Sequence, residues 1–279
     1  LKLFDNFDIG DIIAVNGEII KTKKGELSIK VNETTILSKS LRTLPEKWHG
    51  LKDKETRFRQ RYLDLIVNPE SKRILQTRSN VVRLLREYLH ATEFIEVETP
   101  ILQSKAGGAI AKPFQTHHNA LNLDMYLRIA PELYLKRLVI GGFEKVFEIG
   151  KIFRNEGIDQ THQPEFTMLE SYQAYADMNI VMDMVEDMCN YVFDNLEIDK
   201  KLEFNGEEAS FSGPWKRVSM YDLVSEKFGI KINFNSKFED LSSKLTDQNI
   251  DFEAKTFGLL VFELFENFIE KEIKDPTFV

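Results

Sequence analysis

The sequence predicts an α+β fold in which helices flank an antiparallel sheet. Segments 145–154 and 165–175 have the composition of long strands, and the polar stretch 155–164 joins them, which suits an antiparallel pair. Apolar residues that recur at helical spacing predict amphipathic helices over 70–91, 178–196 and 256–273. We find no internal repeat in the sequence.

The first forty residues predict short β-strands. We expect strands over 12–15, 18–22, 26–31 and 34–38, punctuated at Asn16-Gly17 and Lys24-Gly25. The alternation of Leu27, Ile29 and Val31 predicts one buried face. Because so few strands do not make a stable domain, we expect the back half of a small β-barrel.

The middle of the chain predicts a connection and then the elements of a larger domain. Residues 41–68 hold Pro45, Trp48 and four arginines, and we expect them to form a linker and domain entry. Strands are expected over 94–99 and 126–129, and Pro131 can open a helix because its missing N–H is one that the first turn leaves unpaired.

Composition limits the class of protein. The 279 residues are 42% hydrophobic and 29% charged, which excludes a disordered, collagen-like or low-complexity chain, and the length predicts two domains. No apolar run approaches the roughly 20 residues of a membrane helix. The single cysteine, Cys189, cannot form an internal disulfide, and no signal peptide is recognisable, so we expect a cytoplasmic protein and no membrane partner.

The charge is unevenly distributed. The net charge of the chain is −8, which argues at first against nucleic acid, but residues 1–90 carry +6 and residues 181–279 carry −10. A polyanionic partner would therefore approach the N-terminal part. A solvated mixed surface explains the charge about equally well.

Strand periodicity places a set of chemically distinct side chains on one face. Phe166, Glu170 and Tyr172 share a face of the second long strand, and Arg154 leaves the paired strand just before the turn. The alternatives are a core position for Phe166 and a solvated one for Glu170. Glu132, in the first turn after Pro131, could equally be a helix-dipole residue.

Familiar nucleotide and metal motifs are missing from the sequence. It contains neither a P-loop nor a Rossmann glycine pattern. His117 and His118 are adjacent, which sends their rings to opposite faces of a strand, and no further cysteine or histidine completes a zinc set, so we expect structural histidines.

Several long runs resemble one known family. They are residues 44–50 (LPEKWHG), 59–65 (RQRYLDL), 116–119 (THHN), 126–137 (YLRIAPELYLKR), and 153–157 (FRNEG) followed by His162 and 164–167 (PEFT). Together they resemble the class II lysyl-tRNA synthetases of bacterial type, and the resemblance covers nearly the whole chain.

The resemblance implies a domain plan. Residues 1–43 would be the C-terminal part of an OB-fold that binds the tRNA anticodon, residues 44–68 the linker, and residues 69–279 a truncated class II catalytic domain with an antiparallel sheet. The segment of about 70–100 is similar to the family's first motif and would form a homodimer interface. The implied partners are tRNA-Lys, L-lysine and ATP.

The same resemblance implies roles for individual residues. Arg154 would bridge the lysine carboxylate and the α-phosphate as the catalytic arginine. Glu156 and Gln163 would lie at the adenine, His162 would reach the outer phosphates, and Phe166 would stack on the base. Glu132 and the backbone near Gly108 would hold the lysine α-amine, while Glu170 and Tyr172 would line the pocket for its side-chain ammonium.

These roles also agree with elementary chemistry. Attack of a carboxylate on an α-phosphorus gathers charge on phosphoryl oxygens, and a fixed guanidinium such as that of Arg154 can meet it with two hydrogen bonds. An ammonium is read by a carboxylate and an acceptor oxygen, which Glu170 and Tyr172 supply two residues apart on one strand face.

The sequence departs from the family at several points. Glu93 stands where the first motif usually has Gly, Gln163 where Asn is common, and Lys112 where Arg is common. The third motif, with its second ATP-binding arginine, and the acidic Mg²⁺ ligands would lie beyond Val279, so we expect no metal site within this chain and no activity from the chain alone. A paralogue that attaches lysine to a protein is a second interpretation, but such relatives lack the barrel, so residues 7–40 argue against it. The alternative that stays open is a non-catalytic remnant that serves dimerisation or RNA binding.

Overall fold

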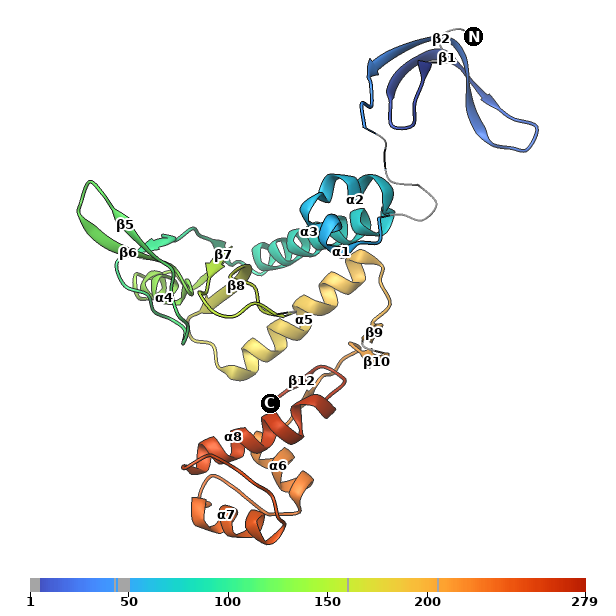
Figure 1. The fold of residues 1–279 in the computed structure, drawn as a ribbon. Coiled ribbons are helices and arrows are strands. Elements are labelled where there is room, and N and C mark those ends of the chain that lie inside the picture. Colours follow the sequence, from blue (N-terminus) through green and yellow to red (C-terminus); the bar gives the residue numbers. More distant parts are fainter. Residues whose placement is uncertain (1–5, 43, 45–50, 160, 205) are drawn as a thin grey trace. The chain divides into compact units, whose positions relative to one another are not determined.

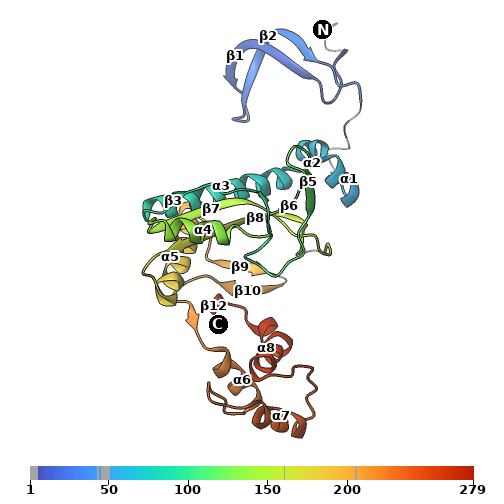
Figure 2. The same cartoon turned by 90° about the vertical axis from the view of Figure 1, so that its left-hand side faces the viewer.

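The computed structural model describes residues 6–42, 44, 51–159, 161–204 and 206–279, and it divides into two compact units, 1–79 and 80–279. Figures 1 and 2 show the element order along the chain. Helices and antiparallel sheets occur together, which confirms the predicted α+β class. The LPEKWHG run, apart from Leu44, lies outside the described residues, as do Pro45 and Trp48.

The N-terminal unit begins with a long hairpin rather than with four short strands. Strand β1 (Ile12–Lys21) pairs antiparallel with β2 (Leu27–Ser38), and the register shifts between Asn16 and Gly17. A Cβ on Gly17 would lie 2.2 Å from the Lys30 carbonyl oxygen, so glycine here permits the close approach of the partner strand at a bulge. The predicted turn at Asn16-Gly17 is therefore wrong, whereas a turn does close at Gly25.

The prediction of a buried face on this hairpin is also wrong. Leu27, Ile29 and Val31 are exposed in the N-terminal unit. Alternation in a sequence indicates which side chains share a face, but burial requires a partner layer as well.

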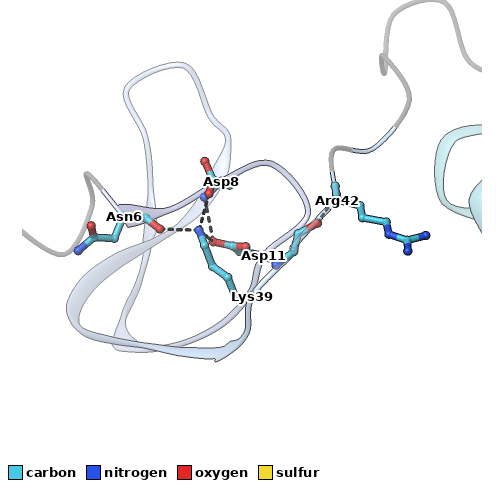
Figure 3. A network of polar contacts seen from close by, with 6 residues as sticks. Asn6, Asp8, Asp11, Lys39 and Arg42 are labelled. Atoms are coloured by element: carbon cyan, nitrogen blue, oxygen red, sulfur yellow. Dashed lines mark hydrogen bonds and ion pairs between the residues drawn. The ribbon is translucent and has the colours of Figure 1, made fainter.

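A polar cluster joins the segment before β1 to the end of β2 (Figure 3). The Lys39 ammonium donates to the Asn6 carbonyl oxygen (2.7 Å), to Asp8 (2.6 Å) and to Asp11 (2.8 Å). The other Asp11 oxygen accepts from the Ser40 backbone N–H at 2.7 Å. The Asp8 backbone N–H also donates to Asp11, at 2.8 Å. The hydrogen bonds that Asp11 accepts lower its pKa to about 2, that from the Asp8 backbone most strongly and that from Lys39 next.

Two helices occupy much of the segment predicted as a linker. They are α1 (Lys54–Arg59) and α2 (Arg61–Val67), and α3 (Pro69–Ala91) follows. The fully buried Asp64 carboxylate pairs with Arg57 (2.7 Å) and Arg61 (2.5 Å) and accepts from Asn68 (2.7 Å). Arg57 on α1 and Arg61 on α2 thus bind the same carboxylate, which holds the two short helices together.

Helix α3 ends in a left-handed turn at Glu93, where the family's first motif usually has Gly. The backbone N–H of Phe94 donates to Leu89 and that of Glu93 donates to His90, and Glu93 itself has φ of 69°. This is the arrangement in which glycine is usually preferred, because a Cβ is strained at positive φ.

The main sheet has the strand order β3-β7-β8. The short β3 (Ile95–Glu96) is parallel to β7 (Lys145–Phe153), and β7 is antiparallel to β8 (Glu165–Gln173), which confirms the two long strands and their pairing. One face carries Phe147, which packs with Leu89 and Phe94 and with methionines of α5 (Met178–Leu196). Helices α3 and α5 thus cover the apolar face; the opposite face of β7 and β8 is the one that carries Glu148 and Glu170.

A second sheet and a helix adjoin the opposite face of β7 and β8. The sheet has the order β4-β6-β5 from β4 (Leu102–Gln103), β5 (Gln115–His118) and β6 (Leu123–Leu127). Helix α4 (Glu132–Ile140) follows with Pro131 at its N-cap and contacts both β7 and β8. Pro131 therefore opens the helix as predicted.

The C-terminal part contains elements that the sequence did not predict. They are β9 (Lys201–Phe204), β10 (Glu207–Ser210), β11 (Lys216–Arg217), α6 (Met220–Phe228), α7 (Phe238–Asp247) and β12 (Thr277–Phe278). The helix predicted over 256–273 is present as α8 (Phe257–Phe268), followed by a short 3₁₀ turn at Glu270–Glu272. Leu223, Leu241, Leu260 and Leu264 are among the buried residues that form the core of this region. None of the described helices combines the length and the apolarity of a membrane span.

Candidate active site

The face of β7 and β8 opposite to α3 and α5 carries a row of polar and aromatic side chains. We call this row the polar wall: Arg154, Phe166, Glu170 and Tyr172. Ile152 pairs with Phe166, Glu148 with Glu170, and Val146 with Tyr172. Because opposite residues of an antiparallel pair share a face, this register puts Phe166, Glu170 and Tyr172 on one surface, and the Arg154 guanidinium lies over the Phe166 ring.

One end of the polar wall is acidic. The Tyr172 hydroxyl donates to the Glu170 carboxylate at 3.0 Å. Burial raises the pKa of Glu170, and the hydrogen bond from Tyr172 opposes that rise. Burial, together with the nearby Glu170 charge, also raises the pKa of Tyr172, which keeps the phenol protonated.

Helix α4 adds a second carboxylate to this end. Glu132 lies in its first turn and pairs with Lys136 at 2.6 Å, and the Lys136 ammonium lies 6.0 Å from the centre of the Tyr172 ring. Gly108 has φ of +87°, and a Cβ there would lie 2.9 Å from the Glu132 Cβ. Gly108, Glu132, Glu170 and Tyr172 are thus brought together.

A buried ion pair lies on the same face, beside the middle of the wall. The Arg128 guanidinium, 2% exposed, pairs with Glu148, 4% exposed, and donates to the carbonyl oxygens of Thr99 (3.2 Å) and Lys151 (2.9 Å). A Cβ on Gly150 would lie 2.1 Å from an Arg128 nitrogen, so the absence of a side chain there leaves room for the guanidinium.

The other end of the wall is a cavity of about 270 Å³. Its lining consists of Arg154, Glu156, Gly157, Thr161, His162, Gln163 and Phe166. The Arg154 guanidinium carbon lies 5.3 Å from the centre of the Phe166 ring, within cation–π range. Among the described side chains, the buried Arg154 Nε has no hydrogen-bond partner, although a buried donor normally has one.

The loop between β7 and β8 is closed by Asp159. Its carboxylate accepts from the backbone N–H groups of Thr161 and His162, each at 2.7 Å, and pairs with His162 Nδ1 at 2.7 Å. These bonds, led by the one from Thr161, hold the pKa of Asp159 well below its usual range. The Gln163 side chain donates to the Asp159 carbonyl oxygen at 3.3 Å. His162 is thereby fixed at the cavity.

Glu156 ties this loop to the segment that carries Gly108. Its carboxylate accepts from the Lys112 backbone N–H at 3.2 Å, while the Asn155 backbone N–H donates to the Lys112 carbonyl oxygen at 2.7 Å. At Lys112, where the family commonly has Arg, both interactions are made by the backbone, so they do not depend on the side chain.

The sequence prediction missed three polar residues of this region: Arg128, Glu148 and Asp159. Arg128 and Glu148 each interrupt an otherwise apolar strand-like segment, which is the one signal that could have indicated a buried pair. Asp159 offered no signal beyond its turn-forming residue type.

The adjacent histidines, His117 and His118, have local partners in the structure. His117 pairs with Asp124 at 2.8 Å, and His118 accepts from the Leu121 backbone N–H at 3.3 Å. No group of three or more His, Cys, Asp or Glu side chains among the residues that the structure describes could hold a metal ion. A larger cavity of about 660 Å³, lined by parts of α5, α6 and α8, contains none of the predicted site residues.

Comparison with known proteins gives a consistent result. Residues 53–279 match the family described as tRNA synthetases class II (D, K and N). The chain is 49% identical over 279 residues to a lysine–tRNA ligase of Syntrophomonas wolfei. It is 50% identical over 285 residues to one of Clostridium botulinum and 48% identical over 285 residues to one of Clostridium tetani. Each alignment covers 100% of this chain, which spans 56–57% of the length of these relatives.

Proposed function

Because the chain belongs to the class II tRNA synthetases of the D, K and N group, we propose that it carries the lysine- and ATP-binding wall of a lysine–tRNA ligase. The parent reaction is the attack of the lysine carboxylate on the α-phosphorus of ATP. The new bond is a mixed anhydride and pyrophosphate leaves. A hydroxyl at the 3′ end of tRNA-Lys then attacks the lysyl carbonyl, and AMP leaves as the anhydride bond breaks.

The observation that carries this proposal is the unsatisfied Arg154 Nε at one end of the wall. A buried guanidinium nitrogen without a partner is costly unless a ligand supplies an acceptor. Phosphate and carboxylate oxygens are the acceptors that suit a guanidinium fork, so Arg154 is the group that would hold the lysine carboxylate against the α-phosphate.

The acidic end favours lysine within the D, K and N group. Glu170, hydrogen-bonded to Tyr172, offers carboxylate and phenol oxygens to an ammonium. An aspartate side chain would be repelled by Glu170, and an asparagine side chain would leave its charge uncompensated. Glu132, beside Gly108, would take the α-ammonium of the substrate in exchange for Lys136.

The cavity residues would hold ATP. Glu156 would accept from the adenine amino group, His162 would donate to the outer phosphates, and Gln163 would support the loop. Phe166 offers an aromatic plane, and an adenine ring stacked on it would lie beside the Arg154 guanidinium or replace it over the ring.

The family also uses Mg²⁺, but the described residues do not fit a resident metal. They include no cluster with enough carboxylate or imidazole ligands, and we assign no step to the ion. The prediction that these 279 residues alone do not complete the reaction stays untested.

The remaining assignments are proposals about the wider protein. The bulged β1–β2 hairpin would belong to an OB-fold that meets the tRNA anticodon, and the basic balance of residues 1–90 supports that partner. The region of about 70–100 would form the homodimer interface. A protein of this function would act in the cytoplasm.

The test is a comparison of three non-hydrolysable aminoacyl-adenylate analogues by isothermal titration calorimetry on the 279-residue chain. Binding of the lysyl analogue at least about tenfold more tightly than the aspartyl and asparaginyl analogues would support the proposal. A preference for either of the other two would overturn the lysine assignment. Binding of none would favour the non-catalytic alternative.

A further inference from the structure

Arg128 and Glu148 form a buried ion pair to which the proposed function assigns no role. The guanidinium donates to Glu148, to the carbonyl oxygens of Thr99 and Lys151, and to the Thr99 hydroxyl at 3.1 Å. The Thr99 hydroxyl in turn donates to the second Glu148 oxygen at 2.6 Å. Both Glu148 oxygens are therefore engaged and turned toward Arg128.

The position of Glu148 gives this pair its significance. Glu148 lies directly opposite Glu170 in the β7–β8 register, so the two carboxylates share one face of the sheet. Side chains at directly opposite positions have Cβ atoms about 4.5–5.5 Å apart, and like charges there repel. Two such carboxylates with no cation between them would tend to share a proton.

We propose that Arg128 is a positioning residue for ammonium recognition: by binding Glu148 it leaves Glu170 as the ionised carboxylate that faces the pocket. This inference rests on the proposed function, in which Glu170 reads the substrate ammonium. Gly150 makes the arrangement possible because its missing side chain leaves space for the guanidinium on this face.

The charged and titratable groups around Glu170 come from several elements. Burial raises the Glu170 pKa most, and the hydroxyl of Tyr172 lowers it; Glu132 on α4 and Glu148 on β7 raise it further, and Arg128 lowers it. Lys136 on α4 pairs with Glu132 and so partly neutralises the charge of that carboxylate. Removing Arg128 alone would leave two carboxylates opposed to Glu170 and one fewer cation.

The experiment follows the titration of Glu170 by ¹³C NMR of side-chain carboxyl groups in the 279-residue chain, with the signal assigned by Glu170→Gln. In Arg128→Met, we expect the Glu170 pKa to rise by about one unit or more. In Arg128→Met/Glu148→Gln, which also removes the opposing charge, it should return to within about half a unit of the original value. In Glu148→Gln alone, it should fall below the original value.

The opposite directions of these shifts separate positioning from a merely structural role. An unmoved Glu170 titration in folded Arg128→Met, or a double variant that fails to restore it, would overturn the inference. If Arg128→Met does not fold, Glu148→Gln decides: an unchanged or raised Glu170 pKa contradicts the proposal. Lysine binding is measured separately, so that shifted titrations without lysine binding would reject the proposed function and leave this inference intact.

Discussion

The Tyr172 hydroxyl donates a 3.0 Å hydrogen bond to Glu170, two residues earlier on the same strand face. The bond stabilises the ionised carboxylate against the burial that raises its pKa. A strand is therefore sufficient to present an acceptor pair of fixed geometry, because its side chains repeat every second residue.

Loss of that hydrogen bond should weaken lysine binding and make it more sensitive to acid. In Tyr172→Phe, we expect the affinity for lysine to fall about three- to tenfold at neutral pH, the typical contribution of one hydrogen bond. The Glu170 pKa should rise, so that binding is lost at a higher pH than in the unaltered chain. Calorimetric titrations with lysine across pH 5 to 9 measure both effects. Loss of lysine binding over the same acidic pH range in the two proteins would contradict the predicted pKa rise.

The Asp159 carboxylate should be needed to present His162. Asp159→Ala removes the acceptor for two backbone N–H groups, and we expect ATP to bind about tenfold more weakly because the loop must then be ordered on binding. Asp159→Asn is the matched control, since its side-chain oxygen can still accept from the backbone, and its loss should be smaller. Equal affinities of the two variants for ATP would contradict this role.

Glu93 should be a site where glycine stabilises the protein. Its φ of 69° is strained for a residue with a Cβ, so Glu93→Gly should raise the free energy of unfolding by about 1 kcal/mol. For a unit of this size, the thermal midpoint should rise by about 2–4 °C. Its pairing with Lys145 at 3.7 Å is too exposed to offset that gain. A lower midpoint for the glycine variant in a thermal melt would disprove the strain.

The N-terminal unit should lose stability in acid through Asp11. Its folded pKa of about 2 lies below the value near 4 of an unfolded aspartate, so its contribution is present above about pH 4 and is lost as the pH falls toward 2. Amide NMR signals of β1 and β2 during an acid titration report this loss. In Asp11→Asn, the unit should be less stable at pH 7 and this part of the pH dependence should be absent. An unchanged acid transition in that variant would refute the assignment.

The sequence predicted the polar wall well because the wall depends on local periodicity. Phe166, Glu170 and Tyr172 lie on one face of an unbroken strand, and Arg154 follows the end of its neighbour, so the hairpin alone brings them together. The helix over 178–196 was predicted with its observed bounds for the same reason: a continuous 3.6-residue pattern.

The errors arose where tertiary partners decide the structure. Gly17 has the appearance of a turn residue, but the close approach of Lys30 makes it a bulge within a longer strand. Leu27 and Val31 alternate as core residues do, yet they are exposed in the N-terminal unit. The Arg128–Glu148 pair joins segments 20 residues apart, a distance over which no sequence period indicates contact.

In the proposed function, Arg154 holds the phosphoryl end of a lysyl adenylate on the polar wall. The dissociation constant of the non-hydrolysable lysyl-adenylate analogue for the unaltered chain, Arg154→Lys and Arg154→Ala measures this role. We predict a weakening of about 10² or more for the alanine variant and a smaller one for lysine, which keeps the charge but not the guanidinium fork. An Arg154→Ala chain that is folded and binds the analogue within about threefold of the unaltered affinity would contradict the claim.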